Sequence, residues 1–76
     1  MQENNQKNLQ ILGKHIKNLR QKHKMKLETF SYYVGVEPST ISRIERGKAE
    51  PKYLTLKNIA EALGYNLSKF FENIEQ

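Results

Sequence analysis

The sequence of 76 residues contains no cysteine and no aspartate, and it has only two prolines and four glycines. Without cysteine, disulfide bonds and thiolate metal sites are excluded, and a reducing compartment is favoured over secretion. Long hydrophobic runs are also missing: the longest apolar-leaning stretch, residues 30–36, is far shorter than the about 18 residues of a membrane span. The polar first residues do not resemble a secretory signal. We therefore expect a cytoplasmic protein that does not bind membranes.

Acidic residues are scarce and unevenly placed. Eight glutamates oppose 13 lysines and arginines, which gives a formal net charge of +5. The whole excess lies in residues 14–26, a segment without any acid whose basic residues are Lys14, Lys17, Arg20, Lys22, Lys24 and Lys26. Such a field attracts polyanions, but a solvated, lysine-rich helix face has the same composition. Charge alone leaves both interpretations open.

Apolar residues recur at helical spacing, which predicts an all-α fold of five short helices around one core. We expect a flexible tail over residues 1–7 and one domain over residues 8–76, with helices at 8–23, 27–34, 38–46, 52–63 and 67–75. Glycine and proline fall at the joints, apart from Gly13. Asn66 is a candidate N-cap for the last helix. The apolar stripes of the helices are interpreted as core and not as a cofactor site. The stripe of the fourth helix includes Tyr53.

Residues 27–47 predict a helix-turn-helix, in which two short helices are joined by a tight turn. The second helix of this motif lies in the major groove of DNA, where all four base pairs can be distinguished. Ile41 and Ile44 give that helix an apolar side for docking. Its opposite side carries a polar stripe at helical spacing, made of Ser39, Ser42, Arg43 and Arg46. Small hydroxyls permit close approach, and an arginine can bind a guanine edge through two hydrogen bonds.

With these residues the sequence resembles the Cro/CI-type (Xre-like) helix-turn-helix family of phage repressors and small bacterial transcriptional regulators. The resemblance covers about residues 11–71. It is densest at residues 35–48, which read Gly-Val-Glu-Pro-Ser-Thr-Ile-Ser-Arg-Ile-Glu-Arg-Gly-Lys. The resemblance implies a lambda-repressor-like domain that binds double-stranded DNA and carries the motif in its second and third helices. It implies no cofactor.

The resemblance also implies roles for individual residues. The positions that would read bases are Ser39, Arg43, Pro38, Ser42 and Glu37. The positions that would contact phosphates are Lys26, Arg46, Lys48 and Thr40. Of these, Thr40 is equally well explained as a solvated helix position. Arg20 and Glu45 match a structural ion pair between the first and third helices.

Three features depart from the family pattern. Leu27 stands where a glutamine often contacts phosphate, and Lys26 beside it is the candidate to bind the same phosphate. Phe30 and Ser31 stand where leucine and alanine are usual, and the interface between the two motif helices must therefore repack. Glu37 stands at the N-cap of the recognition helix. Its carboxylate either caps that helix or accepts a hydrogen bond from a cytosine amino group.

We expect neither a catalytic residue nor a metal site. His15 and His23 lie eight residues apart with no third ligand type near them, which indicates solvated surface residues. The sequence contains no P-loop, GxGxxG or HExxH motif. An enzyme is therefore not expected.

One recognition helix offers roughly three or four base contacts of about 1–3 kcal/mol each. Regulators need about 4–10 kcal/mol over non-specific DNA, so a homodimer on a palindromic operator is expected. We place Phe70 in the core and assign Phe71 and Ile74 to the dimer interface. The leading hypothesis is a dimeric, sequence-specific regulator of transcription, specifically a repressor. The alternatives are an antitoxin that also binds a protein toxin, a restriction–modification controller, or a helical adaptor or RNA-binding protein that uses the basic first helix.

Overall fold

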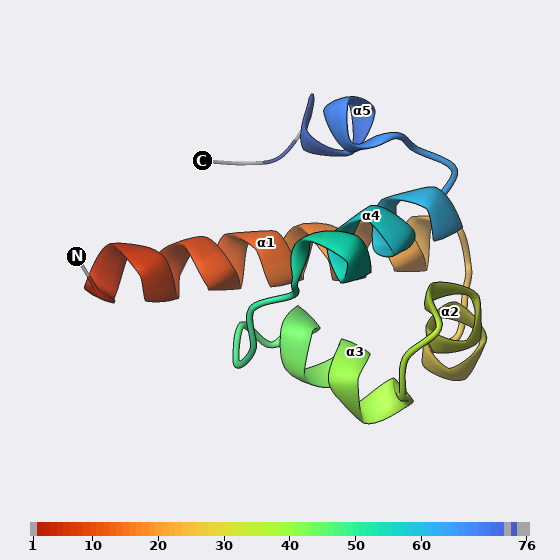
Figure 1. Ribbon diagram of the computed structural model, residues 1–76, viewed down its shortest axis with the longest axis horizontal. Helices are drawn as coiled ribbons and strands as arrows, with labels where there is room; N and C mark the ends of the chain where they lie inside the picture. The colour runs from red at the N-terminus through yellow and green to blue at the C-terminus, as the bar shows by residue number, and fades with distance from the viewer. Residues whose placement is uncertain (1, 73, 75–76) are drawn as a thin grey trace.

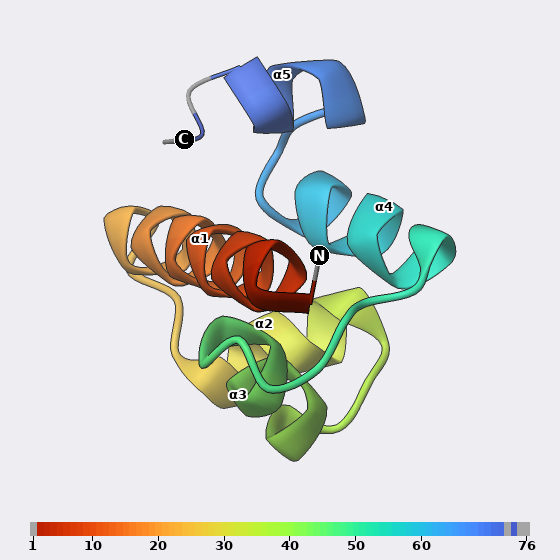
Figure 2. The same ribbon diagram turned by 90° about the vertical axis from the view of Figure 1, so that its left-hand side faces the viewer.

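The computed structural model describes residues 2–72 and residue 74, and in this part of the chain it contains helices and no strand. The five helices are α1 (Gln2–Lys22), α2 (Leu27–Val34), α3 (Pro38–Glu45), α4 (Tyr53–Ala62) and α5 (Leu67–Glu72). The long helix α1 runs the length of the molecule (Figure 1). Viewed nearly along its axis, α1 has α3 on one side and α5 on the opposite side (Figure 2). The predicted all-α fold of five helices is confirmed.

Helix α1 begins at Gln2, so the prediction that the first helix starts at residue 8, after a tail over residues 1–7, is wrong for residues 2–7, which are helical. This stretch has no glycine or proline, and its Gln and Glu residues are good helix formers. It also has a tertiary partner, because the Nε2 of Gln6 donates a hydrogen bond to the carbonyl oxygen of Gly47 (3.4 Å). The first turns of α1 are thereby connected to the loop that follows α3.

Helix α2 matches its predicted range of residues 27–34, and the remaining helix ends lie within one residue of the prediction, except for the end of α5. Asn66 caps α5 as expected, since its Oδ1 accepts a hydrogen bond from the backbone N–H of Lys69 (2.8 Å). Helix α5 ends at Glu72. Of the residues expected to continue this helix, Asn73 and Glu75 lie outside the described residues, and Ile74 is not helical.

The core gathers one or more residues from every helix and is built from Ile16, Phe30, Val34, Ile41, Ile44, Ile59, Ala60, Leu63 and Phe70. The apolar stripe of α4 faces this core except at Tyr53, which is 64% exposed and corrects the expectation that it is buried. Tyr53 is the first residue of α4, where the helix has only begun to cover the core. Within the described residues, none of the helices combines the length and the apolar character needed to cross a bilayer.

Helices α1 and α3 meet at Gly13, which is buried in the middle of α1. A Cβ atom at this position would clash with the carbonyl oxygen of Ile44 and would lie 2.6 Å from that of Glu45. Both contacts are with backbone atoms, which cannot rotate away as a side chain can. The close approach of α3 to α1 therefore requires glycine at position 13.

We predict that Gly13→Ala destabilises the protein although alanine is the better helix former by about 1 kcal/mol. Overpacking against the backbone of α3 should lower the free energy of unfolding by about 1–3 kcal/mol. Urea denaturation followed by circular dichroism measures this change. Lys14→Ala, at the exposed neighbouring position, is the control and should shift stability by no more than about 0.5 kcal/mol. An equal stability of both variants would contradict the close α1–α3 contact.

Candidate nucleic-acid interface

A short turn over residues 35–37 joins α2 to α3. Gly35 takes φ 90°, in the left-handed region that glycine adopts without strain. The N–H groups of Gly35 and Val36 both donate to the carbonyl oxygen of Ser31, at 2.8 and 3.1 Å. Pro38 then occupies the first turn of α3, where its missing N–H costs nothing. The turn ends α2 and redirects the chain within three residues.

The α2 residues that depart from the family pattern pack without leaving a polar group unsatisfied. Phe30 is fully buried in the core. Ser31 is 2% exposed, and its hydroxyl donates to the carbonyl oxygen of Glu28 (2.9 Å). Leu27 packs against the core, and Lys26, exposed at the N-cap of α2, is the basic side chain beside the start of this helix.

Helix α3 has one buried side and one open side. Ile41 and Ile44 are 0% and 3% exposed and dock the helix on the core. On the open side Ser39 and Arg43 are exposed one helical turn apart. The residues at the edges of this side are half-buried: Pro38, Thr40 and Ser42. The fold therefore brings together the polar stripe that the sequence predicts.

Glu37 occupies the N-cap position of α3 in an extended conformation (φ −69°, ψ 148°). Its backbone carbonyl accepts the N–H of Thr40 (3.0 Å), but its carboxylate makes no capping hydrogen bond. Capping through the side chain, one of the two roles considered for Glu37, is thus not observed. The side chain is exposed at the front of α3 instead.

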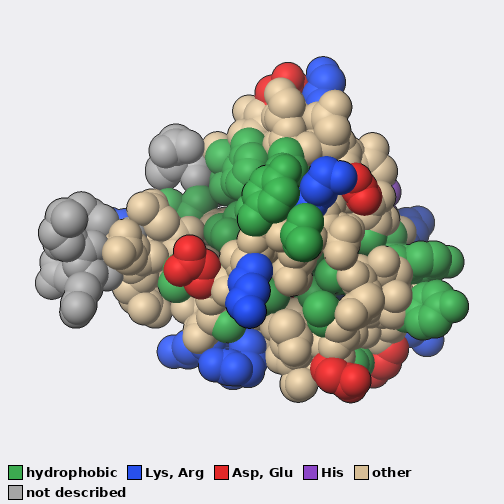
Figure 3. All heavy atoms as spheres, viewed as in Figure 1, with side chains coloured by type: hydrophobic (Ala, Val, Ile, Leu, Met, Phe, Trp, Pro, Cys, Tyr) green, Lys and Arg blue, Asp and Glu red, His purple; other side chains and the backbone are tan. Residues whose placement is uncertain are grey.

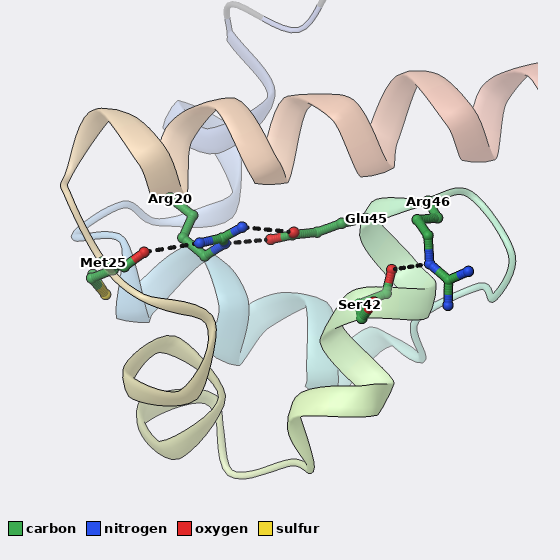
Figure 4. A network of polar contacts seen from close by, with 5 residues as sticks. All are labelled: Arg20, Met25, Ser42, Glu45 and Arg46. Atoms are coloured by element: carbon green, nitrogen blue, oxygen red, sulfur yellow. Dashed lines mark hydrogen bonds and ion pairs between the residues drawn. The ribbon is translucent and has the colours of Figure 1, made fainter.

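Basic side chains border α3 at its C-terminal end. Arg46 follows the helix directly, and Lys48 lies in the next loop; both are exposed. The Nε of Arg46 donates to the carbonyl oxygen of Ser42 (3.3 Å), which holds the side chain along the last turn of α3 (Figure 4). Figure 3 shows lysine and arginine side chains gathered over this end of α3 and the loop. A local positive field therefore lies beside the polar stripe.

Arg20 and Glu45, expected as an ion pair, form one with two hydrogen bonds (Figure 4). Nε of Arg20 lies 2.7 Å from Oε2 of Glu45, and Nη2 lies 3.1 Å from Oε1. The remaining Nη1 donates to the carbonyl oxygen of Met25 (2.9 Å). The two side chains are only 12% and 5% exposed. The pair therefore connects α1, the last turn of α3 and the loop before α2.

Two contacts made by α1 were not expected from the sequence. His15, interpreted as solvated, is half-buried, and its Nε2 donates to the carbonyl oxygen of Phe70 (2.7 Å). The imidazole is protonated at Nε2 because a carbonyl can only accept. Gln6 makes the second contact, with Gly47. Among the residues that the structure describes, no three potential metal ligands lie together.

Comparison with known proteins gives consistent matches. A family model described as helix-turn-helix, HTH_3, matches residues 16–70. The HTH-type transcriptional repressor RghR of Bacillus subtilis is 39% identical over 56 residues, which are 72% of this chain and 42% of RghR. A crystal structure of an HTH_3 family transcriptional regulator from Vibrio cholerae has a TM-score of 0.82 at 30% identity and covers 91% of this chain.

The restriction-modification controller protein C.AhdI from Aeromonas hydrophila shares the fold, with a TM-score of 0.80 at 23% identity. The alignment covers 84% of this chain and 97% of C.AhdI. By contrast, this chain spans only 42% of RghR and 39% of the Vibrio cholerae chain. It thus matches about two-fifths of the length of those two relatives.

We predict that Glu45→Leu lowers the free energy of unfolding by about 3–5 kcal/mol, because it leaves the Arg20 guanidinium buried without a counter-charge. The double variant Arg20→Met with Glu45→Leu should recover most of this loss. Chemical denaturation of all three variants measures the coupling. Lys57→Met is the matched control, because the Lys57–Glu61 pair (3.0 Å) is about half exposed and screened by water. A double variant no more stable than Glu45→Leu would contradict a coupled pair.

Proposed function

The chain belongs to the HTH_3 family of helix-turn-helix proteins, and from this membership we propose that it is a sequence-specific DNA-binding regulator of transcription, acting as a repressor. One observation carries the proposal: α3 buries Ile41 and Ile44 and leaves Ser39 and Arg43 exposed on its open side. A helix of this kind can enter the major groove with its polar residues against the base edges.

Base reading would centre on Arg43 and Ser39. The guanidinium of Arg43 offers a planar fork of donors that matches O6 and N7 of guanine. Ser39, one turn earlier, is short enough to let the start of α3 approach the bases. Pro38 and Ser42 flank these two residues. The exposed carboxylate of Glu37 is an acceptor for the amino group of cytosine.

Phosphate contacts would hold α3 in register without reading sequence. Lys26 lies before α2, whereas Arg46 and Lys48 lie after α3, so the three cations border the motif at both ends. The Nε of Arg46 is engaged by Ser42, which leaves its two terminal nitrogens for a phosphate. Thr40 is half-buried at the edge of α3 and supplies a hydroxyl next to the backbone of DNA.

The regulator would act as a homodimer on a palindromic operator, with Phe71 and Ile74 at the interface. Phe71 is 40% exposed, although its ring also packs edge-on against that of Phe70, with centroids 5.0 Å apart. Tyr53 and Leu54 on α4 are 64% and 67% exposed. Hydrophobic side chains gather between α5 and the start of α4 (Figure 3). A two-fold axis through this face would pair identical apolar patches.

We expect Arg43→Ala to weaken binding to the specific operator by about tenfold or more, corresponding to about 1–3 kcal/mol of lost base contact. Footprinting on DNA upstream of the gene identifies the operator, and fluorescence anisotropy compares its affinity with that of random duplex DNA. Lys26→Ala is the control. It should lower the affinity for the operator and for random DNA equally, and it should reduce the salt dependence of binding by about one phosphate contact. If Arg43→Ala lowers both affinities to the same extent, Arg43 does not read bases, as in an adaptor or RNA-binding protein.

We expect Phe71→Glu to convert the dimer to a monomer at micromolar concentration, because the charge would be buried in the interface. Sedimentation velocity measures the state, and circular dichroism checks the fold. Tyr32→Glu is the matched control, since Tyr32 is 80% exposed on α2, away from α5. A Phe71→Glu variant that remains dimeric would exclude this interface.

A further inference from the structure

An open groove of about 800 Å³ runs between α1 and α5, and neither the recognition helix nor the dimer face accounts for it. Lysines from both walls line it: Lys7, Lys14, Lys22 and Lys69. The apolar side chains that line it are Ile11, Leu19, Tyr65 and Phe70. No acidic residue is part of the lining in the described part of the chain. The groove therefore combines a positive rim with apolar surface.

The groove opens on the side of α1 that faces away from α3. The α1 residues nearest α3 are Gly13 and Arg20, whereas Lys7, Lys14 and Lys22 follow another stripe of the helix. Figure 2 shows α3 and α5 on opposite sides of α1. DNA bound along α3 would thus leave the groove uncovered.

Contacts between the two walls hold the groove in shape. His15 on α1 donates to the carbonyl oxygen of Phe70 (2.7 Å), and the two rings meet edge-on at 4.9 Å. Near the end of α1, the ring of His23 lies edge-on to that of Tyr65, with centroids 6.0 Å apart. A groove that exists before the ligand arrives loses less entropy on binding.

The charges on the rim are largely uncompensated. Lys69 forms an exposed ion pair with Glu72 (3.6 Å). Lys14 and Lys22 have no ion-pair partner among the residues whose side chains the structure describes. Both belong to the acid-free segment 14–26 that holds the net charge of the protein. The groove thus attracts a negatively charged ligand at a site remote from the recognition helix.

From the lysine rim and the apolar lining together, we infer that the groove binds an acidic amphipathic segment of a partner protein. Carboxylates would pair with the lysines, while apolar side chains of the same segment would pack on Ile11, Leu19 and Tyr65, which are half-buried in the groove wall. Helical segments dock in grooves in this way, with anchors spaced one turn apart. A nucleic-acid backbone would use the charge but has no aliphatic side chains for the apolar surface. The inference does not depend on DNA reading by α3.

The probe is a fluorescein-labelled synthetic peptide of about 18 residues, with leucines along one helical face and glutamates along the other. We expect saturable binding to the full chain in fluorescence anisotropy. A peptide of glutamates alone should bind at least about tenfold more weakly, because it lacks apolar anchors. Equal binding by the two peptides would overturn the inference, since the apolar surface would then contribute nothing.

The matched protein variants carry the same change of net charge at different places on the chain. The double variant Lys14→Glu, Lys22→Glu reverses the charge of two lysines on the rim of the groove. The double variant Lys17→Glu, Lys24→Glu reverses the charge of two exposed lysines outside the lining. We expect the first double variant to weaken peptide binding by about tenfold or more and the second by about twofold or less. If both double variants lose peptide affinity equally, the net charge of the protein alone explains the binding, and the inference is overturned.

Two further measurements test other occupants of the groove. Random-sequence duplex DNA is added as a competitor of the peptide. The groove would be assigned to nucleic acid if this DNA displaces the peptide and if only the Lys14→Glu, Lys22→Glu variant binds the DNA more weakly. A loss of self-association in that variant would assign it to a second copy of this chain. Either result would overturn the inference. Ile11→Ser leaves every charge in place. It should weaken binding of the leucine-containing peptide but not binding of the peptide of glutamates alone.

Discussion

The attachment of α3 to α1 is the constraint on which the rest of the structure depends. Arg20 and Glu45 form two hydrogen bonds in an almost fully buried setting, and Gly13 allows the two backbones to approach closely. The third bond of Arg20, to the carbonyl of Met25, extends the same attachment to the loop before α2. The guanidinium of Arg20 therefore contacts both the last turn of α3 and the loop that leads into α2. A buried ion pair adds little stability over an apolar pair, but its geometry is directional and fixes one arrangement.

This attachment matters because α3 is too short to hold a conformation by itself. Isolated helices of fewer than about 12 residues are marginal in water, and α3 has eight. Its conformation and its orientation come from the docking of Ile41 and Ile44 and from the ion pair at its last turn. Once these residues are buried, Ser39 and Arg43 are necessarily presented outward, because they lie on the opposite side of the same helix.

Helix α1 separates the molecule into two surfaces of different chemistry. On one side it supports α3, whose open face is polar and bordered by arginine and lysine. On the other side it forms, with α5, a groove that combines lysines with aliphatic and aromatic side chains. The basic segment 14–26 does not form a single patch. Arg20 is used in the ion pair, Lys26 lies at the start of α2, and Lys14 and Lys22 line the groove.

The sequence by itself determined the features that depend on local spacing: the five helices, the turn at Gly35, the cap at Asn66 and the polar stripe of α3. Its resemblance to a known family also pointed to the pairing of Arg20 with Glu45. Only the tertiary structure decided where α1 begins, how far Tyr53 is exposed, and what His15 and the groove lysines face. The partners concerned are remote in the chain, since Gln6 and Gly47 are 41 residues apart and His15 and Phe70 are 55 apart. Helical periodicity describes which side of a helix is apolar, but it does not specify which distant segment covers that side.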